Sequence, residues 1–187
     1  GNIERVSDVF LTKSVYSTVI SVLTGVFAVV FPFLPRHLSL ASALTIGIPG
    51  FFLALMPNKE RFRPGFFRRV LVFAIPAGII AAASAWTSYA VALWVSEPVL
   101  NAQKAATVSL FIVATGVLAI SARPLNLVRW GIIGLMVASF AAVIYIPPLS
   151  EFFALSLSPE PYSVVAIAVG LAGAVAEIGR ASCRERV

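Results

Sequence analysis

Six long runs without a charged side chain divide the sequence, and they limit its fold more than any other feature. The runs lie between Lys13 and Arg36, His37 and Lys59, Arg69 and Glu97, Lys104 and Arg123, Arg129 and Glu151, and Glu160 and Glu177. The first five hold 22, 21, 27, 18 and 21 residues, and the sixth holds 16. A helix needs roughly 17–25 apolar residues to cross a bilayer. The pattern therefore predicts an all-α, polytopic membrane helix bundle with about six transmembrane helices.

The composition supports this class and excludes several others. Hydrophobic residues make up 59% of the chain and charged residues only 12%, where a soluble domain carries charge on about a quarter of its residues. The single cysteine, Cys183, allows no disulfide framework. The sequence contains no phosphate-binding glycine loop, no HExxH motif and one histidine, His37. Because His37 adjoins Arg36 in a short turn, we expect it at the surface.

The basic residues predict the orientation in the membrane. With a cytoplasmic N-terminus, nine lysines and arginines fall on cytoplasmic segments and two, Arg36 and Lys104, on outer ones. The nine are Arg5, Lys13, Lys59, Arg61, Arg63, Arg68, Arg69, Arg123 and Arg129. Cytoplasmic loops carry such an excess in multi-pass proteins, so both termini are predicted to be cytoplasmic. The net charge of +6 is thereby explained without a nucleic-acid partner.

The predicted helices cover residues 6–33, 38–56, 70–95, 105–122 and 127–146, and a sixth begins at residue 162. We expect one membrane domain over residues 1–176. The last residues, 177–187 (EIGRASCRERV), resemble translated sequencing-adapter read-through, and a natural basic tail is the alternative. Because the chain also begins with glycine instead of methionine, we expect it to be truncated at both ends.

Hydroxyl side chains form a stripe on the first predicted helix. Ser14, Ser17, Thr18 and Ser21 recur at the spacing of one helical face. Such a stripe in lipid faces protein or water, or each hydroxyl bonds to the carbonyl four residues before it. Lys13 stands at the cytoplasmic end of this helix, where its ammonium group either snorkels to the headgroups or acts inside the bundle.

The second predicted helix contains an unusual segment, SALTIGIPG, at residues 42–50. Pro49 has no N–H, and its ring displaces the carbonyl of Thr45 from the helical ladder. Gly47 and Gly50 loosen the same turn, so we expect the helix to unwind between Thr45 and Gly50. Unwound backbone at membrane depth presents carbonyl oxygens, which hard cations bind. A packing kink without an ion is the alternative.

These segments carry a family resemblance. GNIERVSDVFLTKSVYS and FPFLPRHLSLASALTIGIPGFFLALMPN resemble the C-terminal membrane half of bacterial P-type cation-transporting ATPases, closest to the CtpE-like branch linked to calcium or related metals. The resemblance implies transmembrane helices five to ten of such a pump. The family motif Asn-x-x-Thr-Asp-x-x-Pro matches SALTIGIP, so Ser42, Thr45, Ile46 and Pro49 stand at its defined positions. Ile46 replaces the acid.

The resemblance implies a cation pathway between the first two helices. Its members would act through hydroxyl or backbone carbonyl oxygens: Ser14, Ser17, Thr18, Ser42, Thr45, Gly47 and Ile48. Lys13 becomes a candidate countercharge beside the ion, and Pro49 the point of helix unwinding. The basic connection at residues 57–69 matches a loop that docks near the phosphorylation domain, and attraction to anionic lipid is the alternative.

The resemblance also implies what the longer protein would need. Mg²⁺ and ATP would serve the full-length protein, and the transported cation would be Ca²⁺ or another metal cation. The partners would be the lipid bilayer, the upstream cytoplasmic phosphorylation domain and helices one to four of the same protein. The implied location is a bacterial plasma membrane. Because these 187 residues carry neither the phosphorylation nor the nucleotide-binding motif, we expect no cofactor and no ATP hydrolysis from them alone.

Two other functions are compatible with these residues. One is an independent six-helix permease or channel without ATP coupling, and the other is a structural membrane subunit. An upstream reading frame that carries Asp-Lys-Thr-Gly-Thr would distinguish the pump from the permease.

Overall fold

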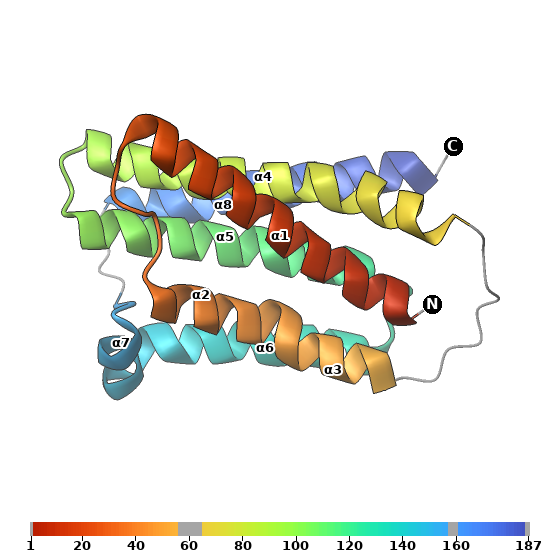
Figure 1. The fold of residues 1–187 in the computed structure, drawn as a ribbon. Helices are drawn as coiled ribbons and strands as arrows, with labels where there is room; N and C mark the ends of the chain where they lie inside the picture. The colour runs from red at the N-terminus through yellow and green to blue at the C-terminus, as the bar shows by residue number, and fades with distance from the viewer. Residues whose placement is uncertain (1, 56–64, 157–160, 186–187) are drawn as a thin grey trace.

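The computed structural model describes residues 2–55, 65–156 and 161–185, which form a bundle of helices (Figure 1). The first half contains α1 (Asn2–Phe27), α2 (Pro35–Ser42), the π-helical turn η1 (Ala43–Gly47), α3 (Ile48–Leu55) and α4 (Phe66–Trp94). The second half contains α5 (Val99–Ser121), α6 (Leu127–Tyr145), α7 (Pro147–Phe153) and α8 (Pro161–Glu185). The described ranges contain no strand, which confirms the predicted all-α class.

Among the described residues, six helical segments are long and apolar enough to cross a membrane, as predicted. α2, η1 and α3 count as one of them, because they run without a break over Pro35–Leu55. The first predicted helix was too long at its C-terminal end, since the chain leaves α1 at Phe27 and turns at Ala28 with a φ of 49°. The short helix α7 was not predicted.

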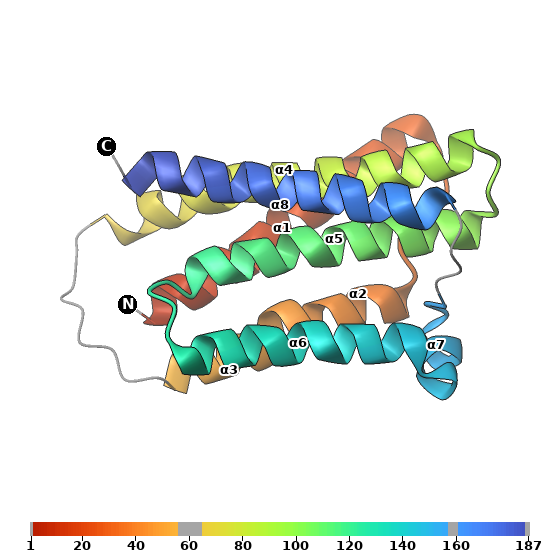
Figure 2. The same cartoon turned by 180° about the vertical axis from the view of Figure 1, so that it is seen from behind.

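The long helices form one group and the remaining ones lie against it. Figures 1 and 2 show α1, α4, α5 and α8 together, with α2, α3 and α6 side by side along one flank. α5 is the most buried span, and its Phe111 ring stacks on Phe140 of α6 with centroids 3.8 Å apart. α8 approaches α4 closely at Gly173, where an added Cβ would lie 2.4 Å from Ser84 Oγ of α4. The core therefore surrounds α5.

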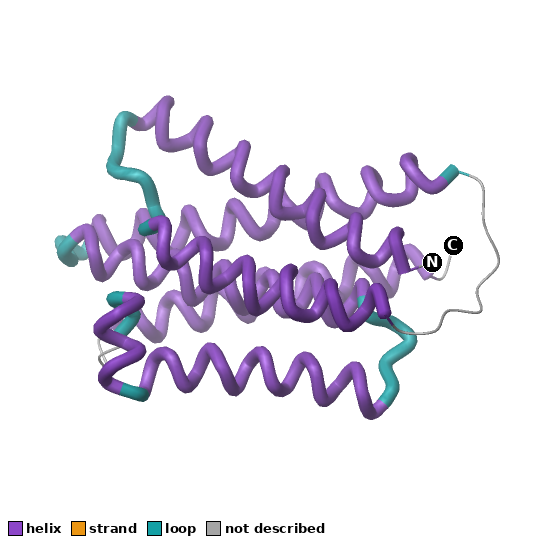
Figure 3. The backbone as a smooth tube through the Cα atoms, turned by 60° about the horizontal axis from the view of Figure 1, so that its bottom comes forward, coloured by secondary structure: helices purple, strands orange, loops and turns teal. Residues whose placement is uncertain are grey.

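Both termini lie at the same end of the bundle (Figure 3). Arg68 and Arg69 begin α4 at this end, and Arg123 and Arg129 flank the turn from α5 to α6. The arrangement matches the predicted grouping of basic residues on one side. Residues 57–64 of the predicted basic connection, with Lys59, Arg61 and Arg63 among them, lie outside the described residues. The opposite end, called the far end below, is the predicted outer side.

Two predictions at the far end were wrong. His37 was expected at the surface, yet its side chain is fully buried, and its Nδ1 lies 3.1 Å from Thr107 Oγ1 of α5. Lys104 is predicted in a loop before the fourth span, whereas α5 begins at Val99 and Lys104 lies within this helix. Pro98 explains the earlier start, because the fixed φ of a proline suits the beginning of a helix.

The stretch at residues 177–187 does not interrupt the fold where it is described. α8 continues through it to Glu185. Its origin from adapter read-through stays a prediction, as does the domain boundary at residue 176.

Candidate functional site: a hydroxyl-lined cavity beside the π-helical turn

A small cavity lies where α1, η1, α4 and α5 meet. Its volume is about 10 Å³, close to the least space that holds one water molecule. Its lining residues are Val9, Thr12, Tyr16, Thr45, Ile46, Ala81, Ala114 and Val117. Three of these eight side chains carry a hydroxyl group in an otherwise apolar wall. The cavity is therefore the place where the first two spans bring polar atoms together inside the bundle.

The hydroxyl groups of this cavity are held by their own helices. Thr12 Oγ1 donates to the Asp8 carbonyl at 2.7 Å, and Thr45 Oγ1 donates to the Ala41 carbonyl at 2.7 Å. Each of these bonds uses the hydroxyl proton and leaves oxygen lone pairs free to accept. Thr12 and Thr45 are both buried. They can therefore offer oxygen to a cation or to a water molecule without breaking these bonds.

Tyr16 and Ser42 add a second pair of hydroxyl groups. Tyr16 is buried, and its hydroxyl group lies beside Ser42. Ser42 Oγ is also buried, yet it makes no hydrogen bond to the protein. A buried hydroxyl without a partner costs free energy. Ser42 Oγ thus lies beside the Tyr16 hydroxyl group but makes no hydrogen bond of 3.5 Å or less.

The predicted hydroxyl stripe of α1 does not face this cavity. Ser14 and Thr18 are exposed, and their hydroxyl groups donate to the carbonyls of Phe10 and Ser14 at 3.3 and 2.8 Å. Ser17 and Lys13 are half-buried. The structure therefore has the back-bonding that the sequence left as one alternative for Ser14 and Thr18. The face that α1 turns inward instead carries Thr12 and Tyr16.

The second span brings two predicted residues to the site and leaves two outside. Thr45 lines the cavity and Ser42 lies beside Tyr16, which also lines it, whereas Gly47 and Ile48 are exposed. Ile46, at the position where the family motif has an acid, is buried and lines the cavity. The π-helical turn thus divides the segment between an inward and an outward face.

The expected unwinding is replaced in this structure by a wider helical turn. Residues Ala43–Gly47 form η1, and the Ile48 N–H bonds to the Ala43 carbonyl five residues before it. Pro49 follows as the second residue of α3. The extra residue in the turn relieves the clash of the proline ring with the preceding carbonyl. The segment adapts to the proline without losing its helical path.

The sequence patterns did not single out Thr12 or Tyr16 as site residues. A signal existed, because Val9, Thr12, Tyr16 and Ile20 share one helical face and all are buried. The same sequence supports two polar faces on α1. Only the position of α4 and η1 decides which face is covered.

The site supplies oxygen ligands without negative charge. The cavity lining includes no carboxylate, and the described residues contain no cluster of three His, Cys, Asp or Glu side chains. Hydroxyl and carbonyl oxygens are hard ligands of the kind that Ca²⁺ and Mg²⁺ bind. When a divalent ion leaves water for a site with only neutral oxygen ligands, these ligands do not offset most of the free-energy cost of its desolvation. A complete site for such an ion needs acidic groups in addition to these residues.

The chain is similar to three curated calcium-transporting ATPases named CtpE. It is 38% identical to the protein of Mycolicibacterium smegmatis over 188 residues, 37% to that of Mycobacterium bovis over 193 and 36% to that of Mycobacterium tuberculosis over 190. Each match covers 93% of this chain but spans only 24% of the relative's length. No protein-family model and no solved structure matches the chain.

Proposed function

We propose that this chain, which belongs to the CtpE-like branch of P-type cation-transporting ATPases, forms the C-terminal membrane region of an ATP-driven cation pump. The identity of 36–38% over 93% of the chain is the observation that carries the proposal. The six membrane-spanning helices agree with it. The relatives are named as calcium transporters, so Ca²⁺ is the cation we assign to the pump.

The inner face of α1 and the π-helical turn supply one side of the ion pathway. Thr12, Tyr16, Ser42 and Thr45 bring hydroxyl oxygens to one point between two spans. The π-helical turn supports this assignment, because such turns occur often at functional sites. Ser14, Ser17 and Thr18 belong to the pathway in this proposal as the wall that faces a further helix. Gly47 and Ile48, which are exposed, contribute backbone carbonyls to the pathway in this proposal.

The charge of the ion requires groups from the rest of the protein. Ile46 leaves the motif without its acid, and the cavity lining is neutral. We assign the missing carboxylates to the membrane helices upstream of Gly1, which would cover the exposed hydroxyls of α1. Mg²⁺, ATP and the phosphorylation domain belong to the same upstream part. The described helices then act as the scaffold and as half of the ion site.

Alternating access follows from movement of α1 relative to the second span. An ion pair joins α1 to α4 near the predicted cytoplasmic end, with Arg69 Nε 2.8 Å from Glu4 Oε1. The Glu4–Arg69 ion pair therefore links the N-terminal end of α1 to the N-terminal end of α4. Phosphorylation upstream would tilt α1, changing the separation of Tyr16 from Ser42 and so the shape of the cavity.

The experiment is Ca²⁺-dependent phosphorylation of the full-length protein by ATP. We expect a phosphoenzyme that forms only with Ca²⁺ and fails in a variant of the upstream aspartate. Tyr16→Phe and Thr45→Val should raise the Ca²⁺ concentration needed, while Gly131→Ala on the exposed side of α6 should not. Phosphorylation that is indifferent to Ca²⁺ would refute the assignment of the ion. A start codon at the position of Gly1, with transport by the chain alone, would favour the permease.

A further inference from the structure

The far end of the bundle contains a buried positive charge with no acidic partner among the described residues. Lys104 is only 8% exposed, and its Nζ makes one long contact, 3.4 Å from Ser156 Oγ. No described carboxylate lies within 4.0 Å of this ammonium group. A buried ammonium is costly unless an opposite charge or several acceptors surround it. Lys104 has neither within the described part of the chain.

A second basic side chain lies at the same end of the bundle, on another helix. Arg36 of α2 is exposed and donates to the Phe152 carbonyl of α7 at 3.0 Å. A guanidinium group has five N–H donors, so most of them are free to bind an anion. Arg36 precedes His37 in α2, and Lys104 lies three residues before Thr107, the residue of α5 that contacts His37. The buried imidazole ring therefore links the two segments that carry these cations.

His37 fixes the spacing of these two cations. The Thr107 hydroxyl donates to the Gln103 carbonyl at 2.7 Å, so its oxygen accepts from His37 Nδ1 at 3.1 Å. This bond ties α2, which carries Arg36, to α5, where Lys104 lies one turn before Thr107. His37 Nε2 is buried and has no partner. His37 is therefore a positioning residue for Arg36 and Lys104.

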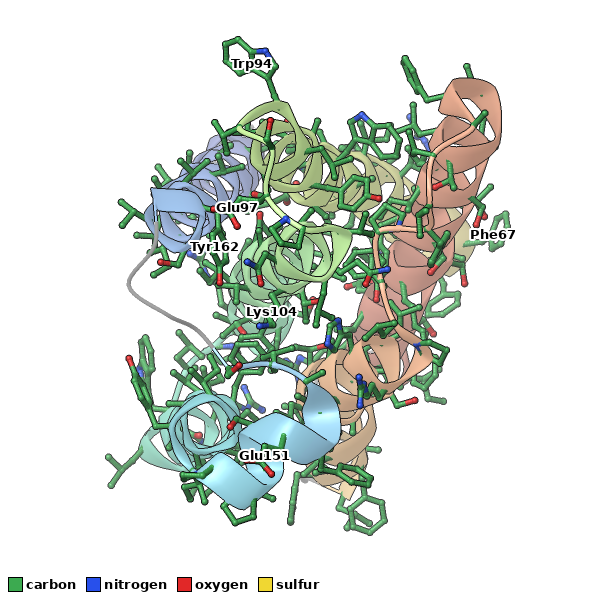
Figure 4. The ribbon with its side chains drawn as sticks, turned by 90° about the vertical axis from the view of Figure 1, so that its left-hand side faces the viewer. Phe67, Trp94, Glu97, Lys104, Glu151 and Tyr162 are labelled. Atoms are coloured by element: carbon green, nitrogen blue, oxygen red, sulfur yellow. The ribbon has the colours of Figure 1, made fainter. Side chains whose placement is uncertain are left out.

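The described carboxylates of this end, those of Glu97 and Glu151, form no ion pair with Lys104. Glu97 Oε2 accepts from Asn101 Nδ2 at 2.8 Å, and Glu151 on α7 is exposed. Figure 4 shows Lys104 between α5 and α7, with Glu97 near Tyr162. Neither glutamate neutralises Lys104 in this structure. The described part of the far end therefore carries two basic side chains on the helices that His37 links.

The position of Lys104 relative to the membrane interface indicates which kind of molecule could supply the missing negative charge. Lys104 lies five residues into α5, about 8 Å along the helix axis from its start. Trp94 and Tyr145, 85% and 81% exposed, end their helices at this end, as aromatic residues do at the membrane interface. α7 exposes Phe152 (70%) to the same zone. Lipid headgroups lie at the level of such interfacial aromatic residues, within reach of a long lysine side chain about one to two turns below it.

We propose that Lys104 and Arg36 bind the phosphate group of an anionic phospholipid at the far end of the bundle. Charge-assisted bonds from lysine and arginine to phosphate are strong in a water-poor environment. The phosphate would offset the buried ammonium and join α2, α5 and α7 on the predicted outer side. The site is separate from the hydroxyl-lined cavity, so the proposal does not depend on the pump assignment.

The test is native mass spectrometry of the full-length protein, delipidated and titrated with phosphatidylglycerol or phosphatidylcholine. We expect phosphatidylglycerol to bind, and Lys104→Gln and Arg36→Gln each to weaken that binding about tenfold, as the loss of one charged hydrogen bond implies. Lys104→Arg should restore it. Arg68→Gln, an exposed cation at the opposite end, is the matched control and should change nothing.

Three results would overturn the proposal. They are equal binding of both lipids, equal binding by wild type and Lys104→Gln, and displacement of the lipid by millimolar inorganic phosphate, which would identify a free-phosphate site instead. Thermal unfolding of each variant without lipid separates misfolding from lost binding. If Lys104→Gln does not fold, the lipid binding of Arg36→Gln decides the question, because Arg36 is exposed and its replacement leaves the core intact. Calcium-dependent phosphorylation should persist in these variants, so failure here is distinct from failure of the pump.

Discussion

Gly78 on α4 is a position where α1 and α4 approach closely, and its replacement tests the packing of the bundle. A Cβ built on Gly78 would lie 2.4 Å from Val15 Cβ and 3.0 Å from the Thr12 carbonyl oxygen. Ordinary van der Waals contacts begin at 3.4 Å, so the Cβ of Gly78→Ala would lie about 1 Å too close to Val15 Cβ. Val15 Cβ is fixed to its backbone, and the helices must separate.

The separation has a predictable energetic cost. Overpacking of a close contact by one methyl group costs about 1–3 kcal/mol. The displaced residues include Thr12, which lines the hydroxyl-lined cavity. We therefore expect Gly78→Ala to lower the free energy of unfolding by about 1–3 kcal/mol and to weaken the dependence of phosphorylation on Ca²⁺.

The assay is reversible unfolding of the purified protein in mixed micelles, titrated with a denaturing detergent. Gly131→Ala on α6 is the control, because nothing lies within 4 Å of its added Cβ. Alanine forms helices more readily than glycine, so the control should gain up to about 1 kcal/mol. Equal unfolding of the two variants would refute the close contact of α1 with α4.

Three further predictions concern the two spans that form the site. Pro49→Ala supplies an N–H to the Thr45 carbonyl and should convert η1 to an ordinary α-helical turn, seen as slower amide exchange at residues 45–48; unchanged exchange would contradict this. Ser42→Ala removes a hydroxyl without a partner, so the free energy of unfolding should stay within about 0.5 kcal/mol, and a larger loss would reveal an unseen partner. Glu4→Gln should lower the free energy of unfolding by about 0.2–1 kcal/mol, since both partners of its ion pair are partly exposed. A double-mutant cycle with Arg69→Gln should show a coupling energy between the two residues, and purely additive losses would contradict the ion pair.

The helices were predictable because membrane spans need long apolar runs, and the charges that separate them were visible in the sequence. Errors arose where local chemistry overrode that rule. α7 begins with two prolines, Pro147 and Pro148, which fit the first turn of a helix as well as a loop. Lys104 was read as a loop residue because it is charged, yet α5 buries it. A single basic residue near a span end does not reveal whether the helix has begun.

The candidate site was predictable only in part. The proline and glycines of the second span correctly marked an irregular turn, but not its type, because a π-helical turn and an unwound segment both accommodate Pro49. The choice of face on α1 depends on long-range packing. Ser14 and Thr18 bond to their own helix, and α1 turns Tyr16 inward because Ala81 of α4 leaves room for a large ring beside the cavity.

The most direct test is ATP-dependent movement of radioactive calcium across proteoliposomes that contain the full-length protein. The proposed pathway predicts transport that requires ATP, and that falls in Tyr16→Phe and Thr45→Val but not in Gly131→Ala. Calcium movement without ATP, or equal transport by all three variants, would contradict a pathway through the hydroxyl-lined cavity.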